Sequence, residues 1–149
     1  MNLKERLNED MKTAMRARSS GTERLSVIRL ARAAIKNIEI DKRHELNDEE
    51  VLEVLAREVK QRRDALAEFG EKGGPEYRAK LESEIAILLE YLPQQLSEAD
   101  LRTIIQEAIA ATGAASAKEM GKVMGQLMPR VKGRADGKLV NQLVREMLP

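Results

Sequence analysis

Apolar residues recur along this chain at the spacing of an α-helix, and aromatic residues are almost absent. Phe, Tyr and Trp together number three in 149 residues. Aliphatic side chains and methionine must therefore fill the core, as they do where helices pack on helices. Segments in which strand-forming residues alternate with polar ones are missing. The sequence predicts an all-α fold.

The first 92 residues predict four helices. Turn-forming residues at 19–21 and 70–75 end two of them, and Asn47 opens another as the first residue of a capping box with Glu50. The helix over residues 22–41 is apolar over a wide arc that includes Leu30, so we expect it to lie centrally and to pack on more than one side. These helices predict a bundle-like domain over residues 1–92.

The segment Pro93-Gln-Gln-Leu96 is the best candidate for a linker, because helices usually end before a residue that precedes proline. Capping boxes that begin at Ser97 and Ser116 predict the starts of two further helices. The second of these helices has five apolar residues on one face: Met120, Val123, Met124, Leu127 and Met128. We expect a smaller three-helix domain over residues 97–149, with the linker at 93–96.

Positive charge is concentrated near the C-terminal end. The whole chain carries a net charge of +1, whereas residues 118–149 contain seven Lys/Arg and three Asp/Glu, a net charge of +4. A local excess of this kind indicates an anionic partner more directly than the charge of the whole chain does.

The segment Pro129–Lys138 connects two apolar stripes and contains two glycines, four cations and one acid. A glycine-bearing basic loop at a helix start brings backbone N–H groups and cationic side chains together, which suits a phosphate. We expect contacts mostly from the Lys132, Arg134 and Lys138 side chains and the Gly133 N–H, with Arg130 nearby. An equally open interpretation is that these cations are ordinary surface charges and the glycines ordinary helix ends.

A second basic cluster consists of Arg57, Lys60, Arg62 and Arg63, with Glu58 and Asp64 between them. Arg62 interrupts an apolar stripe, which favours an ion pair inside the bundle with the side-chain stem covering apolar surface. With so few aromatic residues, stacking on single-stranded bases is not expected. Any nucleic acid would be recognised through its backbone and shape.

The composition excludes several classes of site. The chain has no cysteine and one histidine, His44, in a polar turn, so disulfides, thiolate metal sites and Cys–His catalysis are excluded. No nucleotide-binding glycine motif is present. We predict no catalytic residue, metal or cofactor. Without a membrane-length apolar run or a signal peptide, we expect a cytoplasmic protein. The sequence leaves the oligomeric state open, with a monomer favoured.

Three stretches resemble a known family: Ala34–Glu39; Lys60–Asp64 together with Tyr91–Ser97; and Gly121–Gly125 running into Lys132–Asn141. The resemblance is to the YqeY-like family of small bacterial proteins, which is related to the C-terminal tail of the B subunit of the tRNA-dependent amidotransferase. It implies a two-part helical fold. The tail is similar to residues from about 97 onward and engages tRNA there. Its matching positions are Lys122, Lys132, Gly133, Arg134, Ala135, Asp136, Val140 and Asn141.

These observations lead to a hypothesis of a non-catalytic accessory protein that binds tRNA or another structured RNA beside the aminoacylation machinery. An amidotransferase activity would belong to the relative, whose chemistry resides in other domains and another subunit. The alternative is a protein-interaction module that docks on a synthetase or amidotransferase complex, because a methionine-rich stripe suits adaptable apolar contacts. An enzyme is the third hypothesis.

Overall fold

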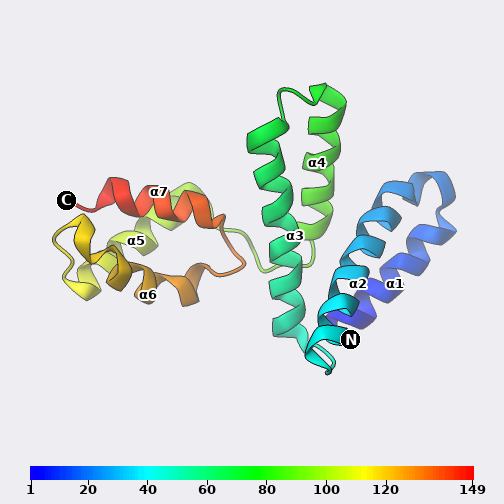
Figure 1. The fold of residues 1–149 in the computed structure, drawn as a ribbon, viewed down its shortest axis with the longest axis horizontal. Helices are drawn as coiled ribbons and strands as arrows, with labels where there is room; N and C mark the ends of the chain where they lie inside the picture. The colour runs from blue at the N-terminus through cyan, green and yellow to red at the C-terminus, as the bar shows by residue number, and fades with distance from the viewer. The chain divides into compact units, whose positions relative to one another are not determined.

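The computed structural model covers residues 1–149 and consists of helices without a strand (Figure 1). This confirms the predicted all-α fold. The α-helices are α1 (Leu3–Arg16), α2 (Thr22–Lys42), α3 (Asp48–Phe69), α4 (Gly74–Leu89), α5 (Glu98–Thr112), α6 (Met120–Val131) and α7 (Gly137–Met147). Two short 3₁₀ helices, η1 (Arg18–Gly21) and η2 (Ala117–Glu119), precede α2 and α6. The chain divides into two compact units, Met1–Leu92 and Pro93–Pro149, each with its own apolar core.

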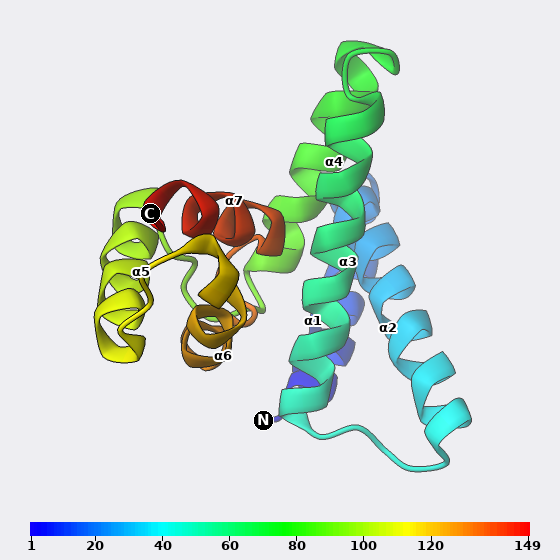
Figure 2. The ribbon, with the colours of Figure 1, turned by 60° about the vertical axis from the view of Figure 1, so that its left-hand side comes forward.

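In the first unit, α1 and α2 form one antiparallel pair, and α3 and α4 form another (Figures 1 and 2). Helix α2 packs against α1, α3 and α4, as the breadth of its apolar arc predicted. Its buried residues are Val27, Ile28, Ala31 and Ile35. The arc is narrower than predicted, because Leu30 is 52% exposed. One face of α2 therefore remains in solvent.

Two of the three predicted capping boxes form. Asn47 and Glu50 exchange side-chain-to-backbone hydrogen bonds of 2.9 and 3.2 Å at the start of α3, and Ser97 does the same at the start of α5. The prediction at Ser116 is wrong, since its side chain makes no capping hydrogen bond. The next residues wind as the 3₁₀ helix η2, and Glu119 turns back to accept a hydrogen bond from the Ala115 N–H.

A cluster of polar contacts joins the C-terminal residues of the first unit to α1 and α2. Tyr91 is 4% exposed and its hydroxyl donates to the Asp10 carboxylate. The guanidinium of Arg6 lies 4.5 Å from the centre of the Tyr91 ring, a distance typical of a cation–π contact. Beside it, Arg24 pairs with Glu90 at 2.8 Å. The residues just before Pro93 are thus held by α1 and α2.

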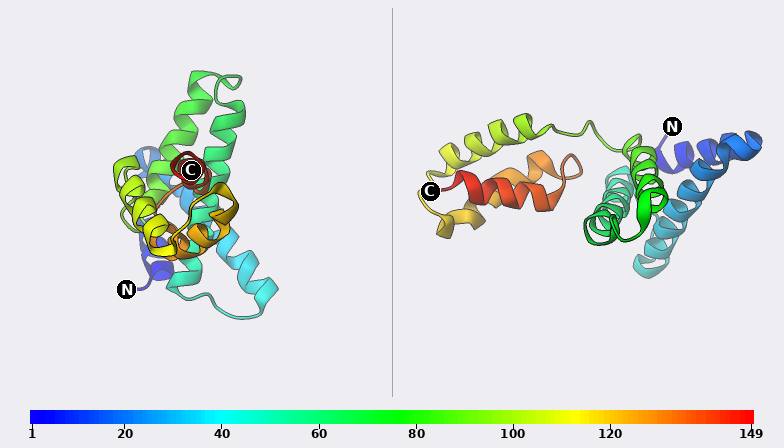
Figure 3. Two further views of the ribbon diagram at one scale, coloured as in Figure 1. Left: turned by 90° about the vertical axis from the view of Figure 1, so that its left-hand side faces the viewer. Right: turned by 90° about the horizontal axis from the view of Figure 1, so that it is seen from above.

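The second unit is a three-helix assembly in which α5 packs against α6 and α7, and α6 packs against α7 (Figure 3). Helix α6 is longer than predicted, because Pro129 lies inside it and Val131, 2% exposed, completes its buried face. The connector between α6 and α7 consequently shortens to residues 132–136. Met128, predicted to share the buried stripe, is 42% exposed.

Candidate nucleic-acid interface

The connector over residues 132–136, here called the basic loop, has a backbone that its sequence largely determines. The Lys132 N–H caps α6 by donating to the Met128 carbonyl at 3.0 Å. Gly133 follows with φ of 73°, a left-handed conformation that glycine adopts without steric cost. Asp136 is the N-cap of α7 and accepts a hydrogen bond of 3.2 Å from the Lys138 N–H. The loop therefore leads directly from one capped helix end into the next.

Residues 94–96, here called the strap, form hydrogen bonds with the basic loop. The Leu96 N–H donates to the Arg134 carbonyl at 2.8 Å, and the Gln95 side-chain amide donates to the Gly133 carbonyl at 2.9 Å. In return the Arg134 guanidinium donates to the Gln94 carbonyl at 3.2 Å. The predicted linker residues are thus hydrogen-bonded to the second unit. These contacts limit the conformations that the loop can adopt.

The predicted phosphate-binding cations take different positions. Lys132 is exposed at the start of the basic loop, and Lys138 is exposed two residues beyond its end, in the first turn of α7. Arg134 is only half-exposed, and its guanidinium also donates to the Arg130 carbonyl at 3.4 Å. Arg130 pairs with Glu107 of α5 at 2.7 Å. Both arginines form contacts within the fold, and the exposure of Lys132 and Lys138 makes these two lysines accessible to an anion.

Of two other predicted site residues, one lies near the basic loop and one lies far from it. Asn141 is exposed on α7, three residues after Lys138, and therefore lies on the same side of the helix. Lys122 is exposed near the start of α6, eight residues or about 12 Å along the helix axis from Arg130. Lys122 therefore belongs to the far end of α6 from the basic loop.

Sequence reasoning missed Arg145 and the two glutamines of the strap. Arg145 is exposed on α7 at seven residues after Lys138 and four after Asn141, so these three side chains share one face. The helical spacing alone contains this signal. No comparable signal marks Gln94 and Gln95, because their contacts with the basic loop are 40 and 38 residues apart in the chain.

A comparison with protein-family models tests the family resemblance that the motifs suggested. The family model described as Yqey-like protein matches residues 4–148. The chain belongs to the YqeY-like family. The search of curated proteins found no match.

The second basic cluster of this YqeY-like protein is not a continuous surface. The Arg62 side chain is 11% exposed and pairs with Glu58 and Glu84, both at 3.3 Å, which agrees with its interpretation as an ion-pair partner inside the bundle. Arg57 and Lys60 are exposed, and Lys60 pairs with Asp64 at 3.1 Å. Arg63 is half-buried. Arg62 cannot contact an external anion without leaving two carboxylates.

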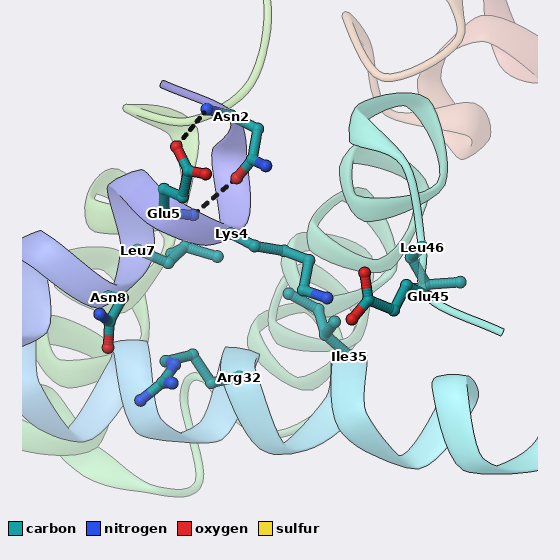
Figure 4. A pocket seen from close by; sticks show the side chains of 9 residues that line it. All are labelled: Asn2, Lys4, Glu5, Leu7, Asn8, Arg32, Ile35, Glu45 and Leu46. Carbon is teal, nitrogen blue, oxygen red and sulfur yellow. Dashed lines mark hydrogen bonds between the residues drawn. The ribbon is translucent and has the colours of Figure 1, made fainter.

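An open pocket of about 360 Å³ lies in the first unit between α1, α2 and the residues before α3 (Figure 4). Its polar groups already serve the fold. Asn2 and Glu5 exchange the hydrogen bonds that cap α1, and Lys4 pairs with Glu39 at 2.6 Å. Nowhere in the chain do three or more His, Cys, Asp or Glu gather to hold a metal ion. None of its helices combines the length and the apolar character needed to cross a membrane.

Proposed function

We propose that this YqeY-like protein is a non-catalytic accessory protein that binds tRNA or another structured RNA through the second unit. The observation that carries the proposal is the placement of Lys132 and Lys138. Both lysines are exposed, Lys132 at the start of the basic loop and Lys138 two residues beyond its end. Hydrogen bonds from Gln95 and Leu96 hold the loop backbone. An ordered backbone leaves less conformational freedom to be lost when its cations meet a phosphate, which favours binding.

The chemistry of the surface favours the backbone of a folded RNA over exposed bases. Residues 93–149 contain no Phe, Tyr or Trp, and base stacking on aromatic rings is what sequence-tolerant single-strand binders use. Lys138, Asn141 and Arg145 share one exposed face of α7, which supplies two cations and an amide to a sugar-phosphate chain. Contacts of this type position a protein on RNA by shape.

We propose that the protein acts beside the aminoacylation machinery. This part of the proposal rests on the family's relationship to the tRNA-engaging tail of the amidotransferase. An amidotransferase label would describe that relative. In this chain, the proposed surface consists of ammonium, guanidinium and amide groups, which bind anions and do not constitute a nucleophile with its base. The protein would deliver, shield or orient an RNA for another enzyme.

Equilibrium binding of the intact chain to tRNA over a salt series tests the proposal. The observed association constant should fall steeply as salt rises, because each neutralised phosphate releases counterions. Double-stranded DNA of equal length, measured in parallel, should bind more weakly if the fold of tRNA is recognised. Absence of tRNA binding even at low salt would show that the proposal is wrong.

A specific observation supports the alternative of a protein-docking module. Met128 is 42% exposed on α6, and methionine adapts its shape to apolar partners. A pull-down from bacterial lysate with and without ribonuclease separates the two functions. Partners that survive nuclease treatment and are lost in a Met128→Lys variant would favour docking over RNA binding.

A further inference from the structure

Three cations form a row on the solvent face of α2. Arg29, Arg32 and Lys36 are all exposed, and their spacing of three and four residues places them on one side of the helix. They span about 10.5 Å along the axis at 1.5 Å per residue. The row lies in the first unit and was not apparent as a cluster in the sequence, where neutral and apolar residues separate its members.

The same stretch of α2 is almost free of negative charge. Between Arg24 and Ile40 its one acid is Glu39, whose side chain is 12% exposed. The ammonium of Lys4 lies 2.6 Å from the Glu39 carboxylate, and the Leu46 N–H donates to it at 2.9 Å. The Lys4 hydrogen bond, followed by that of Leu46, holds the pKa of Glu39 below its ordinary value. Glu39 is thus a structural anion, neutralised within the fold.

The row differs in this respect from other exposed cations of the chain. Arg78, Lys60 and Arg102 each pair with an acid four residues away on the same helix. Arg29 and Lys36 form no ion pair, although the charge of Lys36 also helps to lower the pKa of Glu39. Arg32 donates to the Met11 sulfur at 2.9 Å. A thioether is a weak hydrogen-bond acceptor. Figure 4 shows Arg32 on α2 beside Asn8 of α1, at a pocket that Glu5 and Glu45 also line.

We propose that this face of α2 is a second binding surface for the phosphate backbone of RNA, an inference that rests on the proposed function. Arg29, Arg32 and Lys36 would each contact a phosphate. Ser26, Ala33 and Asn37 are exposed among them and are small or uncharged, which allows a sugar-phosphate chain to approach, while the exposed Leu30 and Ile40 lie at the edges of the row. The charge of the row complements a polyanion.

An anionic membrane fits this face less well than RNA does. Membrane-surface helices bury a continuous apolar side in the lipid. The apolar side of α2 is occupied by the core of the first unit, and only Leu30 and Ile40 among its large apolar residues are predominantly exposed. Two isolated residues do not form an inserting face.

The test uses the full-length chain with Arg29→Gln, Arg32→Gln and Lys36→Gln combined, titrated with tRNA over a salt series. Affinity at low salt should fall about tenfold, and the slope of log K against log salt should become shallower by about two to three. The matched control is Lys72→Gln, Arg78→Gln and Lys80→Gln, which removes the same charge from exposed positions around α4. This control should keep more of the parent's affinity and slope.

A second variant distinguishes the loss of charge from a structural effect of the substitutions. The pair Arg29→Lys and Arg32→Lys keeps the charges and should retain tRNA binding, and circular dichroism melts should match the parent for every variant. Parental binding by the glutamine triple variant, or an equal loss in the control triple, would overturn the inference. Loss of binding to phosphatidylserine vesicles with unchanged tRNA binding would also overturn it.

The failure of this inference is distinguishable from failure of the proposed function. If Lys132→Gln with Lys138→Gln weakens tRNA binding while the α2 variant does not, the basic loop stands and the α2 surface is wrong. If the parent binds no tRNA at all, both proposals fall together.

Discussion

Tyr91 shows how one buried side chain makes the stability of the first unit depend on pH. Burial, and then the hydrogen bond to Asp10, raise the pKa of the Tyr91 hydroxyl well above its ordinary value of 10.0. A tyrosine whose pKa is raised by folding stabilises the folded state below the unfolded pKa. This contribution is lost as pH rises toward the folded pKa, because the unfolded chain releases its proton first.

We therefore predict that the free energy of unfolding decreases above about pH 10, by at most about 1.4 kcal/mol per pH unit for this group. Tyr91→Phe should be less stable than the parent at pH 8 and should show a smaller decrease between pH 9 and pH 11. Urea denaturation at each pH measures both effects. Equal pH dependence in parent and variant would contradict the role of Tyr91, since titrating lysines contribute to both equally.

Arg62 is the residue whose sequence context was most informative. A cation inside an apolar stripe predicted an ion pair within the bundle, and the structure confirms this through Glu58 and Glu84. Glu58 is one turn away on α3 and could be predicted from i, i+4 spacing. Glu84 lies on α4, and its identity as a partner depends on how α3 and α4 pack.

Arg62→Ala should destabilise the protein by about 3 kcal/mol, because it leaves the 8% exposed Glu84 without its cation. The matched control is Arg57→Ala on the exposed side of α3, with an expected change within about 0.5 kcal/mol. Chemical denaturation measures the two values. Similar stabilities for both variants would show that the Arg62 ion pairs contribute nothing net.

At the scale of single elements, helix positions were predictable where local rules dominate and were missed where packing dominates. Asn47 and Ser97 cap helices as predicted, because a capping box depends on neighbours three residues apart. At Ser116 the same pattern failed, since residues 117–119 form a 3₁₀ helix. Pro129 was expected to end α6, yet the helix continues to bury Val131. Core burial outweighed the local cost of a proline.

The basic loop illustrates the same limit within the candidate site. Its glycine and cations are contiguous, so the sequence located them. The strap of residues 94–96 is distant in the chain, and no pattern predicted that the presumed linker would hold the loop.

The strap gives a prediction that separates positioning from charge. Gln95→Ala removes the hydrogen bond to the Gly133 carbonyl, together with a local one to the Pro93 carbonyl, without altering net charge. We expect tRNA affinity to fall about fivefold, equivalent to about 1 kcal/mol for a lost hydrogen bond, with the salt slope unchanged. The exposed Gln142, substituted in the same way, is the control. A reduced slope in the Gln95 variant would contradict a purely positioning role.

At the scale of the whole molecule, the second unit is small for an independent domain, since its 57 residues lie between Pro93 and Pro149. Domains of about 60 residues bury a limited fraction of their surface and are often marginally stable. Because the strap contacts the basic loop, the residue at which a C-terminal fragment begins should affect its stability. A fragment that begins at residue 97 lacks the Gln95 and Leu96 contacts with the basic loop.

We predict that a fragment of residues 93–149 retains measurable tRNA binding and melts at a lower temperature than the intact chain. A fragment of residues 97–149 should melt lower still and bind more weakly. Circular dichroism melts and binding titrations of the two fragments measure these differences. Identical behaviour of the two fragments would show that the strap contributes neither stability nor loop order.

The most direct test of the account is the salt-dependent binding of tRNA by the intact protein with Lys132→Ala and Lys138→Ala combined. A Lys72→Ala and Lys80→Ala variant, at exposed positions in the first unit, carries the same charge change. The account predicts weaker binding by the loop variant, with a slope of log K against log salt shallower by about two, and a smaller effect in the control. If the loop variant binds tRNA with the affinity and slope of the parent, the basic loop is only a connection between two helices.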